Sequence, residues 1–588
     1  MPTFVPTLAS GLVHAVLALM AGACADGGRP TLEARPPADD VLTFRVNTAR
    51  RHPISRFVYG MNFATERDAW GGAEPPAFTF NRMGGNRLSA YNWETNHSNA
   101  GSDYQYQNDQ LLSSSLVPGE AVRARAAATF ARGAAFMATV PMLPFVAGDA
   151  CHCNVGTSDA GRALRLARHF RQNVPARGAP PAGVPLGSAP SGDVPSGRVP
   201  DTSDRAVYQD EFVAWAARTF PGATGDSARR LVFSLDNEPD LWHGTHEEVQ
   251  SDVSDDPRAP RLQTYDGFID TTIAFARAMK RVAPDAIVFG PALATYTGQV
   301  TLGRHPADDP VYGSWRTRPF LDVYLDRLRA AEQREGRRLV DVLDVHWYPA
   351  AQDGHEVTND HAPQDSAMIE ARLQAPRALW DPAYDERSWV TGVTGGPVRL
   401  LPRLREQIAA HYPGTQLAVT EYYYGRGGDV SGGIAQADVL GIFGREGVYA
   451  AALWPAAGLW AEPYGGRGER AYAYLFGAFR MYLDYDGAGG RFGDTGVEAT
   501  TTDAATSSVY ASLDARGRVI VVAINKRRVA QPVRLTVAHQ GALRTVRTYR
   551  LTAAGPAPVR GADLAVEAGN ELAYTMPALS VSTLVLAP

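Results

Sequence analysis

Residues 231–242 read LVFSLDNEPDLW, a short apolar run that ends in a polar tip. The run at 231–235 has the length and composition of a buried β-strand, and Glu238 follows it within three residues. A second apolar run, QLAVTEYYYG at 416–425, carries Glu421. Burying a carboxylate costs free energy, so two carboxylates at the tips of buried strands indicate a functional site.

The chain around this stretch alternates between short apolar runs and segments of helical character. Helix-compatible segments lie at 119–132, 208–219, 265–282, 319–335 and 399–411. The eight expected strands lie at 57–63, 78–83, 136–146, 231–235, 286–293, 342–348, 417–422 and 448–454. This alternation predicts an α/β fold, a (β/α)8 TIM-like barrel over residues 54–483. Glu238 then ends the fourth strand and Glu421 the seventh, at the end of the barrel where active sites lie.

Two regions fall outside this alternation. Residues 174–203 are dense in Pro, Gly and Ser, and we expect a flexible insertion on the barrel surface without a function of its own. After residue 484 the runs shorten and alternate, as in RVIVVAINK, which predicts an additional antiparallel β-sandwich domain over 484–588. The strand at 41–53, which begins VLTFRVNT, also alternates and is expected to join this sandwich.

The N-terminal residues 1–40 have the composition of an export signal and a linker. Residues 12–25 (LVHAVLALMAGACA) are apolar but too few to span a bilayer comfortably, so we expect a cleaved signal and no transmembrane span. The stretch 21–24 resembles a loose bacterial lipoprotein cleavage site, which leaves a lipid anchor at Cys24 as an alternative. No Lys or Arg precedes the apolar stretch, although signal peptides usually begin with positive charge. We expect a secreted or cell-surface protein.

Composition argues against several other functions. The formal net charge is −5 and no basic run is present, so we expect no nucleic acid partner. Lys280 and Lys526 are the only lysines, which leaves almost no candidates for Schiff-base or lysine-dependent phosphate chemistry. Cys151 and Cys153 are separated by one residue, and a local disulfide or two thiols fits this spacing better than a zinc site. We expect a monomer.

Two carboxylates at one rim are the minimum machinery for hydrolysing a glycosidic bond. With retention of configuration, one carboxyl group protonates the leaving oxygen while a second, about 5 to 5.5 Å away, attacks the anomeric carbon. Barrel strands that end at the same rim can hold Glu238 and Glu421 at this spacing. Such chemistry requires no cofactor, and the sequence contains none of the common metal-binding motifs.

Six longer motifs follow one another along the chain: FNRMGGNRLSAYNWETNHSNAGSDY (80–104), SLDNEPDLWHGTH (234–246), DVLDVHWYP (341–349), ALWDPAYDERSW (378–389), AVTEYYYG (418–425) and DYDGAGGRFGD (484–494). By these motifs the chain, from about residue 42 to its C-terminus, resembles glycoside hydrolase family 44, which includes endoglucanases and xyloglucanases.

The resemblance implies a retaining endo-β-1,4-glucanase that acts on xyloglucan, cellulose-type and mixed-linkage glucans. It implies Glu238 as the acid/base and Glu421 as the nucleophile. Similar enzymes can carry structural calcium, but the sequence does not locate such a site. Residues 174–203 make the connection between the third and fourth strands longer than is usual in this family.

Further polar and aromatic residues are predicted to bind substrate. Strand alternation places His346 and Tyr348 on the face that approaches Glu421, whereas Asp344 lies deeper and is expected to be structural. Asn237 is expected to hydrogen-bond a sugar hydroxyl, as the Asn beside the acid does in similar enzymes. Aromatic rings pack on the apolar faces of pyranoses. The remaining candidates are Asn86 at the floor of the cleft and the aromatic residues Trp93, Tyr296, Trp389, Tyr423 and Trp454.

Two alternative functions remain open at this point. One is another retaining glycosidase built from a barrel and a sandwich, such as an arabinofuranosidase or a xylanase. The other is a polysaccharide-binding protein without catalytic activity, against which the presence of both glutamates argues.

Overall fold

The computed structural model describes residues 41–156, 162–177, 200, 205–249, 264–303, 308–309, 311–350, 355–456 and 469–587. The expected export signal at 1–40, including Cys24, lies outside these residues. Most of the Pro/Gly-rich segment 174–203 does too. None of the helices within the described residues is both long enough and apolar enough to cross a membrane.

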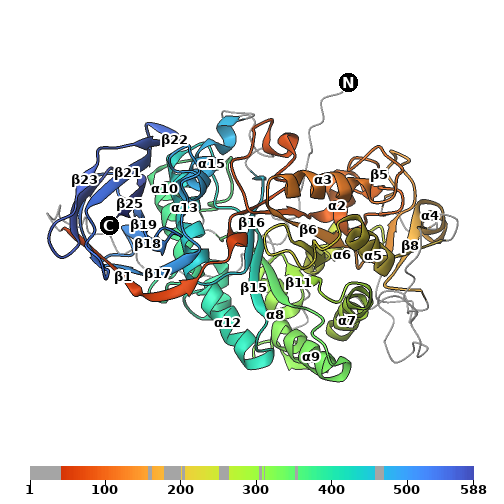
Figure 1. Ribbon diagram of the computed structural model, residues 1–588. Helices are drawn as coiled ribbons and strands as arrows, with labels where there is room; N and C mark the ends of the chain where they lie inside the picture. The colour runs from red at the N-terminus through yellow and green to blue at the C-terminus, as the bar shows by residue number, and fades with distance from the viewer. Residues whose placement is uncertain are drawn as a thin grey trace.

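Eight parallel strands close into a barrel and follow one another around it in chain order. The predicted (β/α)8 barrel is therefore confirmed, with Glu238 after its fourth strand and Glu421 in its seventh. The strands are β2 (Gly60–Asn62), β3 (Phe80–Met83), β6 (Ala135–Val140), β10 (Leu231–Leu235), β11 (Ile287–Leu293), β14 (Val342–Trp347), β15 (Gln416–Tyr422) and β16 (Ala450–Leu453). Figure 1 shows β11, β15 and β16 of this barrel beside the blue C-terminal strands.

The run at 136–146, expected as one strand, divides into β6 and a separate strand, β7 (Phe145–Ala147). Pro141 and Pro144 lie between the two, and proline has no N–H with which to continue a strand ladder. β7 pairs with β8 (Phe170–Val174), which pairs with β9 (Ala206–Tyr208) in a small sheet beside the barrel. The loop after β7 contains a disulfide between Cys151 and Cys153, one of the two states that the sequence left open.

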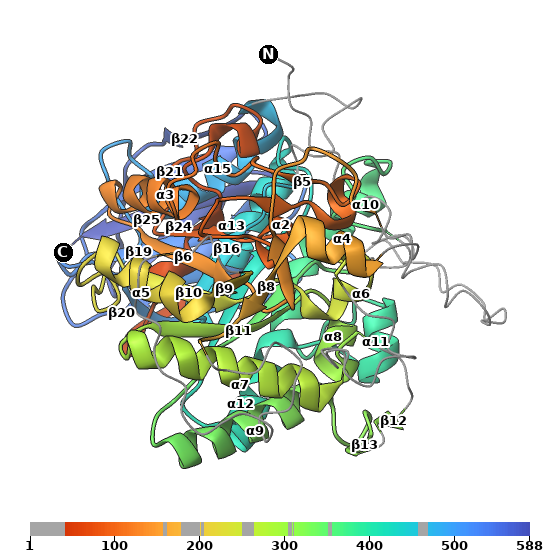
Figure 2. The same ribbon diagram turned by 90° about the vertical axis from the view of Figure 1, so that its right-hand side faces the viewer.

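Helices surround the barrel and bury their apolar faces against it. In α7 (Tyr265–Val282), the side chains of Phe268, Phe275 and Met279 are buried at helical spacing. Thr264 caps the start of this helix, because its hydroxyl accepts a hydrogen bond from the Gly267 N–H at 3.1 Å. α9 (Phe320–Glu335) packs beside α7 and also beside α12 (Leu400–His411), and the three helices lie near one another in Figure 2. The other long helices are α3 (Glu120–Ala131), α5 (Gln209–Thr219), α13 (Val430–Arg445) and α15 (Glu469–Leu483).

The second domain is a mostly antiparallel β-structure that includes the first strand of the chain, in agreement with the predicted fold class. β1 (Leu42–Pro53) pairs with β17 (Thr495–Thr501) and, in parallel, with β20 (Gln531–Ala538). The remaining strands are β18 (Ser507–Leu513), β19 (Val519–Asn525), β21 (Thr545–Thr552), β22 (Gly555–Arg560), β23 (Leu564–Ala565), β24 (Glu571–Met576) and β25 (Ser580–Ala587).

The central strand β19 is apolar on both faces because both faces are covered. Val519, Val521 and Ala523 pack inside the β-domain, with Phe44 of β1. Ile520 and Val522, on the opposite face, join the large apolar core that surrounds the barrel. The two domains therefore share a packed interface.

Both lysines of the chain are buried and ion-paired. Lys526 lies at the interface between the domains, where its Nζ is 2.7 Å from an oxygen of Asp438 on α13, and Tyr510 donates to the other oxygen at 2.5 Å. Lys280, near the end of α7, lies 2.8 Å from Asp341 and donates to the Ala286 carbonyl at 2.7 Å. Each ammonium thus offsets its burial with a carboxylate.

Candidate active site

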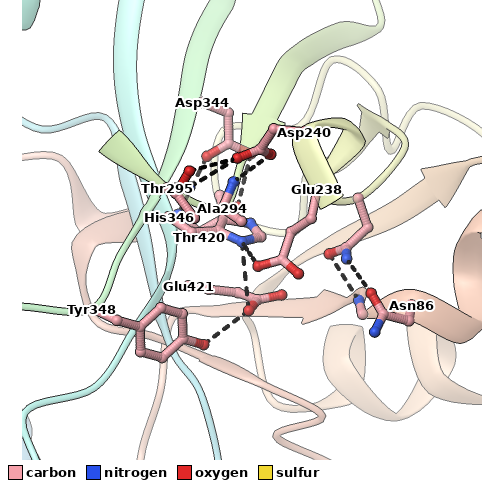
Figure 3. A network of polar contacts seen from close by, with 12 residues as sticks. Asn86, Glu238, Asp240, Ala294, Thr295, Asp344, His346, Tyr348, Thr420 and Glu421 are labelled. Carbon is pink, nitrogen blue, oxygen red and sulfur yellow. Dashed lines mark hydrogen bonds and ion pairs between the residues drawn. The ribbon is translucent and has the colours of Figure 1, made fainter. Parts of the chain in front are cut away.

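Glu238 and Glu421 meet at the C-terminal end of the barrel (Figure 3). One oxygen of each carboxyl group and one ring nitrogen of His346 all lie within 4.8 Å of one another. Glu421 is 4% exposed, and the side chain of Glu238 is 14% exposed, so the pair is largely withdrawn from water.

A β-bulge directs Glu421 into the barrel. Val345 of β14 is opposite Val419 of β15, but His346 is opposite Glu421, so Thr420 is an extra residue. Without this bulge, strict alternation from Ala418 would turn Glu421 outward. Asp344 accepts hydrogen bonds from the Thr420 hydroxyl at 2.7 Å and from its N–H at 3.3 Å. The expectation that Asp344 is structural agrees with these contacts, since they fix the bulge.

Left-handed backbone conformations direct the polar tip of β10. Asp236 and Glu238 have φ values of 66° and 46°, which few residues other than glycine adopt. The turn that follows is held by Asp240, whose carboxylate accepts hydrogen bonds from Ala294 N at 2.9 Å and from the Thr295 hydroxyl at 2.9 Å (Figure 3). Strict alternation along a strand would point Asn237 and Glu238 in opposite directions. The left-handed conformations bring both side chains to one site, where Asn237 contacts Arg82 and Glu238 contacts His346.

Glu421 accepts one hydrogen bond on each oxygen. Arg82 Nη1 lies 2.6 Å from Oε1, and Tyr348 donates its hydroxyl proton to Oε2 at 2.9 Å. The fully buried guanidinium also contacts Asn62 at 3.0 Å. These contacts fix both oxygens of Glu421 and place a permanent positive charge beside the carboxylate.

Glu238 has a different environment, in which burial raises its pKa from 4.5 to about 7 against the opposing effect of Arg82. His346 Nδ1 lies 2.8 Å from Glu238 Oε1. Burial also lowers the pKa of His346 to about 3, so its ring is neutral, although the negative charge of Glu421 acts in the opposite direction. Because Arg82 Nη2, a donor, faces His346 Nε2 at 3.4 Å, we assign the ring hydrogen to Nδ1, which donates to Glu238.

The two carboxyl groups are thus equipped for different tasks. Glu238 holds a proton up to about pH 7 and can release it to a leaving oxygen. Glu421 lies between Arg82 and Tyr348, each of which hydrogen-bonds one of its oxygens. The three ligand atoms of Glu238, His346 and Glu421 are also close enough to share a metal ion. The arginine 2.6 Å from Glu421 already supplies a cation there, so the site fits acid and nucleophile chemistry better than metal binding.

A polar network connects the acid to the loop after β3. Asn237 Oδ1 accepts hydrogen bonds from Arg82 Nη2 at 2.7 Å and from Gly85 N at 3.1 Å, while its amide donates to Asn86 Oδ1 at 3.3 Å. Asn86 lies on the opposite side of Glu238 from Tyr348 (Figure 3). The glycine pair before it permits this close approach: a Cβ on Gly84 would lie 2.2 Å from the Arg82 guanidinium, and Gly85 has a φ of 87°.

The predicted aromatic candidates divide into two groups. Trp454 is half-buried, and it lies at the site because its ring would be 2.9 Å from a Cβ on Gly85. Trp389, in α11 (Trp389–Thr394), is 43% exposed. Trp93 and Tyr423 are instead fully buried.

The platform role predicted for Trp93 and Tyr423 is therefore corrected to a packing role. Trp93 packs against Phe212, with ring centroids 5.8 Å apart, and Tyr423 donates to Asp360 at 2.6 Å. Tyr296 is also buried, and the guanidinium of Arg403 lies 4.3 Å from its ring and donates to its hydroxyl at 2.8 Å. These three rings offer no open face to a sugar.

Arg82 was not among the predicted site residues, although it contacts Glu421, Asn237 and His346. A signal for it exists in the sequence. The expected second strand reads FNRM, and an arginine within a buried strand requires a carboxylate nearby.

Comparison with known sequences identifies relatives along nearly the whole chain. The family model of Glycoside hydrolase family 44 matches residues 97–351. Endoglucanase A of Paenibacillus lautus is 33% identical over 567 residues, which cover 93% of this chain and 73% of that protein. Beta-mannanase/endoglucanase A of Caldicellulosiruptor saccharolyticus is 32% identical over 513 residues, which cover 83% of this chain but only 34% of that larger protein.

Solved structures agree with this result. A family 44 xyloglucanase from Paenibacillus polymyxa, solved with xyloglucan, superimposes with a TM-score of 0.78 at 32% identity and covers 93% of this chain and 100% of its own. A family 44 endoglucanase from Clostridium thermocellum gives the same TM-score, identity and coverage. With its barrel, its second β-domain and its paired glutamates, the chain belongs to glycoside hydrolase family 44 and is a glycoside hydrolase.

Proposed function

We propose that the protein is a retaining endo-β-1,4-glucanase that hydrolyses xyloglucan and related cellulose-type and mixed-linkage glucans. The observation that carries the proposal is the proximity of Glu238 and Glu421, which present carboxyl oxygens within 4.8 Å of each other. Inverting enzymes separate their carboxyl groups by about 6.5 to 9.5 Å to admit a water molecule, whereas retaining enzymes hold them at about 5 to 5.5 Å. The names of the relatives, endoglucanase and xyloglucanase, support the substrate class.

In the first step, Glu421 attacks the anomeric carbon while Glu238 gives its proton to the departing glycosidic oxygen. The glycosidic bond breaks, and a covalent bond forms between the sugar and a Glu421 oxygen. Arg82 and Tyr348 orient the attacking carboxylate through the 2.6 Å and 2.9 Å contacts. His346, neutral and fixed in one tautomer, orients Glu238 without competing for its proton.

In the second step, water replaces the departed glucan. Glu238, now ionised, takes a proton from the water as it attacks the anomeric carbon, and Glu421 leaves as a carboxylate. Two inversions at one carbon give net retention. No cofactor takes part in either step, because the two carboxyl groups carry out all proton and bond transfers.

Substrate contacts are assigned to Asn237, which is fully buried beside Glu238, and to Trp454 at the rim. Asn237 uses one hydrogen of its amide for Asn86, and the second can reach a sugar hydroxyl. The half-buried Trp454 supplies an aromatic face for a pyranose.

Since β-glucans are polymers found outside cells, we propose that residues 12–25 direct export, which makes the enzyme secreted or cell-surface bound.

Two variants and one added nucleophile test the mechanism. With an activated aryl β-cellobioside, Glu421→Ala should lose hydrolysis and regain turnover with azide, which replaces the missing carboxylate and gives the α-glycosyl azide. Glu238→Ala should form the glycosyl-enzyme, which azide then attacks to give the β-glycosyl azide. The reverse pattern would exchange the two roles, and an inverted product from the unaltered enzyme would refute retention.

A polymer panel tests the substrate class. Xyloglucan, carboxymethylcellulose and arabinoxylan are incubated separately with the unaltered enzyme, and product sizes are followed over time. The proposal expects mid-chain cleavage of the first two. Activity on arabinoxylan alone would instead indicate the xylanase or arabinofuranosidase alternative, and no turnover of any polymer would favour a binding protein.

A further inference from the structure

A buried ion pair lies behind the loop that carries Asn86. His246 and Glu248 are both fully buried in the segment that follows Glu238, and His246 Nδ1 lies 2.8 Å from Glu248 Oε1. The other ring nitrogen, Nε2, lies 2.8 Å from the main-chain oxygen of Asn86. A carbonyl oxygen only accepts hydrogen bonds, so Nε2 carries a hydrogen. With a carboxylate at Nδ1, both ring nitrogens face acceptors.

The surroundings favour the charged ring. Burial opposes the charge, but Glu248 and the Asn86 carbonyl outweigh it, so the pKa of His246 is raised above 6.5. Two further acids face the ring from other elements: Asp236, at the end of β10, and Asp103, in the 3₁₀ turn Gly101–Tyr104. Burial raises the pKa of both carboxyl groups, that of Asp103 to about 7, so each favours the charged ring only when it is ionised. Among other nearby cations, Arg165 donates to the Glu248 main-chain oxygen at 3.4 Å, and the charge of Arg87 acts on Asp103.

The ring is enclosed tightly as well as paired. A Cβ on Gly101 would lie 3.0 Å from His246 Cε1 and 2.2 Å from the Thr245 oxygen, and Gly101 has a φ of 56°. Only glycine fits there without strain. The turn Gly101–Tyr104 thus closes over His246, and Asp103 of the same turn accepts the Asn86 amide at 2.8 Å.

Through Asn86, His246 is connected to the acid/base strand. Its contact fixes the main chain of Asn86, whose side chain contacts Asn237, the residue before Glu238. The main chain of Asn237 is also fixed by Trp242, which donates its Nε1 hydrogen to the Asn237 carbonyl at 2.9 Å. His246 N in turn donates to the Trp242 carbonyl at 2.9 Å. His246 therefore connects the segment that follows Glu238 to the loop that carries Asn86, and Asn86 in turn contacts Asn237.

We propose that His246, held as an imidazolium by Glu248, is a positioning residue that aligns Asn86 and Asn237 for the sugar at the reaction centre. This inference rests on the function proposed above, because Asn237 matters only if a glycoside binds beside Glu238. Hydrogen bonds to the sugar 2-hydroxyl strengthen in the transition state of glycoside hydrolysis. Misalignment of Asn237 should therefore lower kcat more than it raises KM.

Two substitutions at one position separate positioning from simple packing. In His246→Gln, the side-chain amide nitrogen replaces Nε2 and can still donate to Asn86. In His246→Asn, the amide nitrogen replaces Nδ1 and reaches only Glu248. We expect His246→Asn to lose about 10- to 100-fold in kcat on xyloglucan with little change in KM, and His246→Gln to recover most of this loss. His169→Asn is the matched control: its amide nitrogen replaces the Nδ1 that lies 2.7 Å from Asp149, away from the two glutamates, and kcat should stay unchanged.

The charge state is measured independently of activity. In protein labelled with ¹⁵N-histidine, the signals lost in both His246 variants belong to this ring, and we expect two protonated nitrogens at pH 7. Glu248→Gln should leave the ring neutral at that pH. A neutral ring in the unaltered protein, or equal kcat in both His246 variants and the unaltered enzyme, would overturn the inference. Failure of the unaltered enzyme to hydrolyse any glucan would instead overturn the proposed function, and the ring measurement would still stand.

Discussion

Replacing Glu238 with Gln should stabilise the protein, and by an amount that grows with pH. The pKa of Glu238 is raised from 4.5 to about 7 by burial. Below about pH 4.5 the carboxyl group is neutral in both the folded and the unfolded protein, so Glu and Gln should be nearly equivalent. Between pH 4.5 and about 7 only the unfolded chain ionises at this position. The unaltered protein therefore loses folding stability as the pH rises from the unfolded pKa through the folded pKa.

The size of the effect follows from the same shift. A pKa raised from 4.5 to about 7 corresponds to about 3 kcal/mol of unfolding free energy once the group is ionised in both states. Solvent screening reduces this figure little, because the side chain is only 14% exposed. The advantage of Glu238→Gln should therefore rise from near zero at pH 4.5 to about 3 kcal/mol above pH 7 and then level off.

Thermal unfolding of both proteins at pH 5, 6, 7 and 8, at one scan rate, measures this difference. Glu386→Gln is the matched control, because burial raises the pKa of Glu386 to about 7 as well. Its partner is the Ser388 hydroxyl, at 2.5 Å, in place of a histidine ring. Both variants should gain stability with pH, but only Glu238→Gln should lose hydrolysis of xyloglucan. A difference in midpoint that stays constant or shrinks with rising pH would refute the reasoning.

Three further outcomes are expected. Tyr348→Phe removes the 2.9 Å hydrogen bond to Glu421 and should lower kcat on an aryl cellobioside about 10- to 150-fold, since bonds to charged groups contribute about 1.5 to 3 kcal/mol; an unchanged kcat would contradict this role. Trp454→Ala should raise KM for xyloglucan and spare kcat, whereas a loss in kcat alone would place the ring outside the binding surface. Asp438→Asn leaves Lys526 buried without its carboxylate and should cost about 3 to 5 kcal/mol in unfolding experiments, with activity at 25 °C retained. An unaltered unfolding midpoint would show that the pair contributes nothing.

The barrel and its two glutamates could be predicted because they depend on local pattern and on one geometric rule. Each barrel strand is a short apolar run, and parallel strands that close into a barrel bring their C-terminal ends to one rim. Asn237 and Glu238 follow the fourth run and Glu421 lies in the seventh, so their proximity needs no knowledge of the loops. The bulge at Thr420 could not be predicted from the sequence. The expected proximity of Glu421 to Glu238 did not depend on it, because both residues lie at strand ends that meet at one rim.

Residues in long loops were harder to place. Trp93 follows a rim strand by ten residues, but its ring turns back onto α5, where Phe212 and Trp215 cover it. The contact between His246 and the Asn86 carbonyl joins two loops separated by 160 residues, and no periodicity in either loop encodes it. Loop side chains are positioned by such non-local contacts, which pattern reading cannot recover.

The two buried lysines give the folded protein an unusual chemical surface. The other residues counted with lysine as basic are arginines, which carry no amine. A mild acylating reagent therefore finds no accessible side-chain amine among the lysines while the protein remains folded. Labelling at Lys280 reports opening around α7 and the barrel, whereas labelling at Lys526 reports separation of the barrel from the β-domain. Mass spectrometry of the two acylated peptides would thus follow the loosening of each region separately, with two probes that are native to the chain.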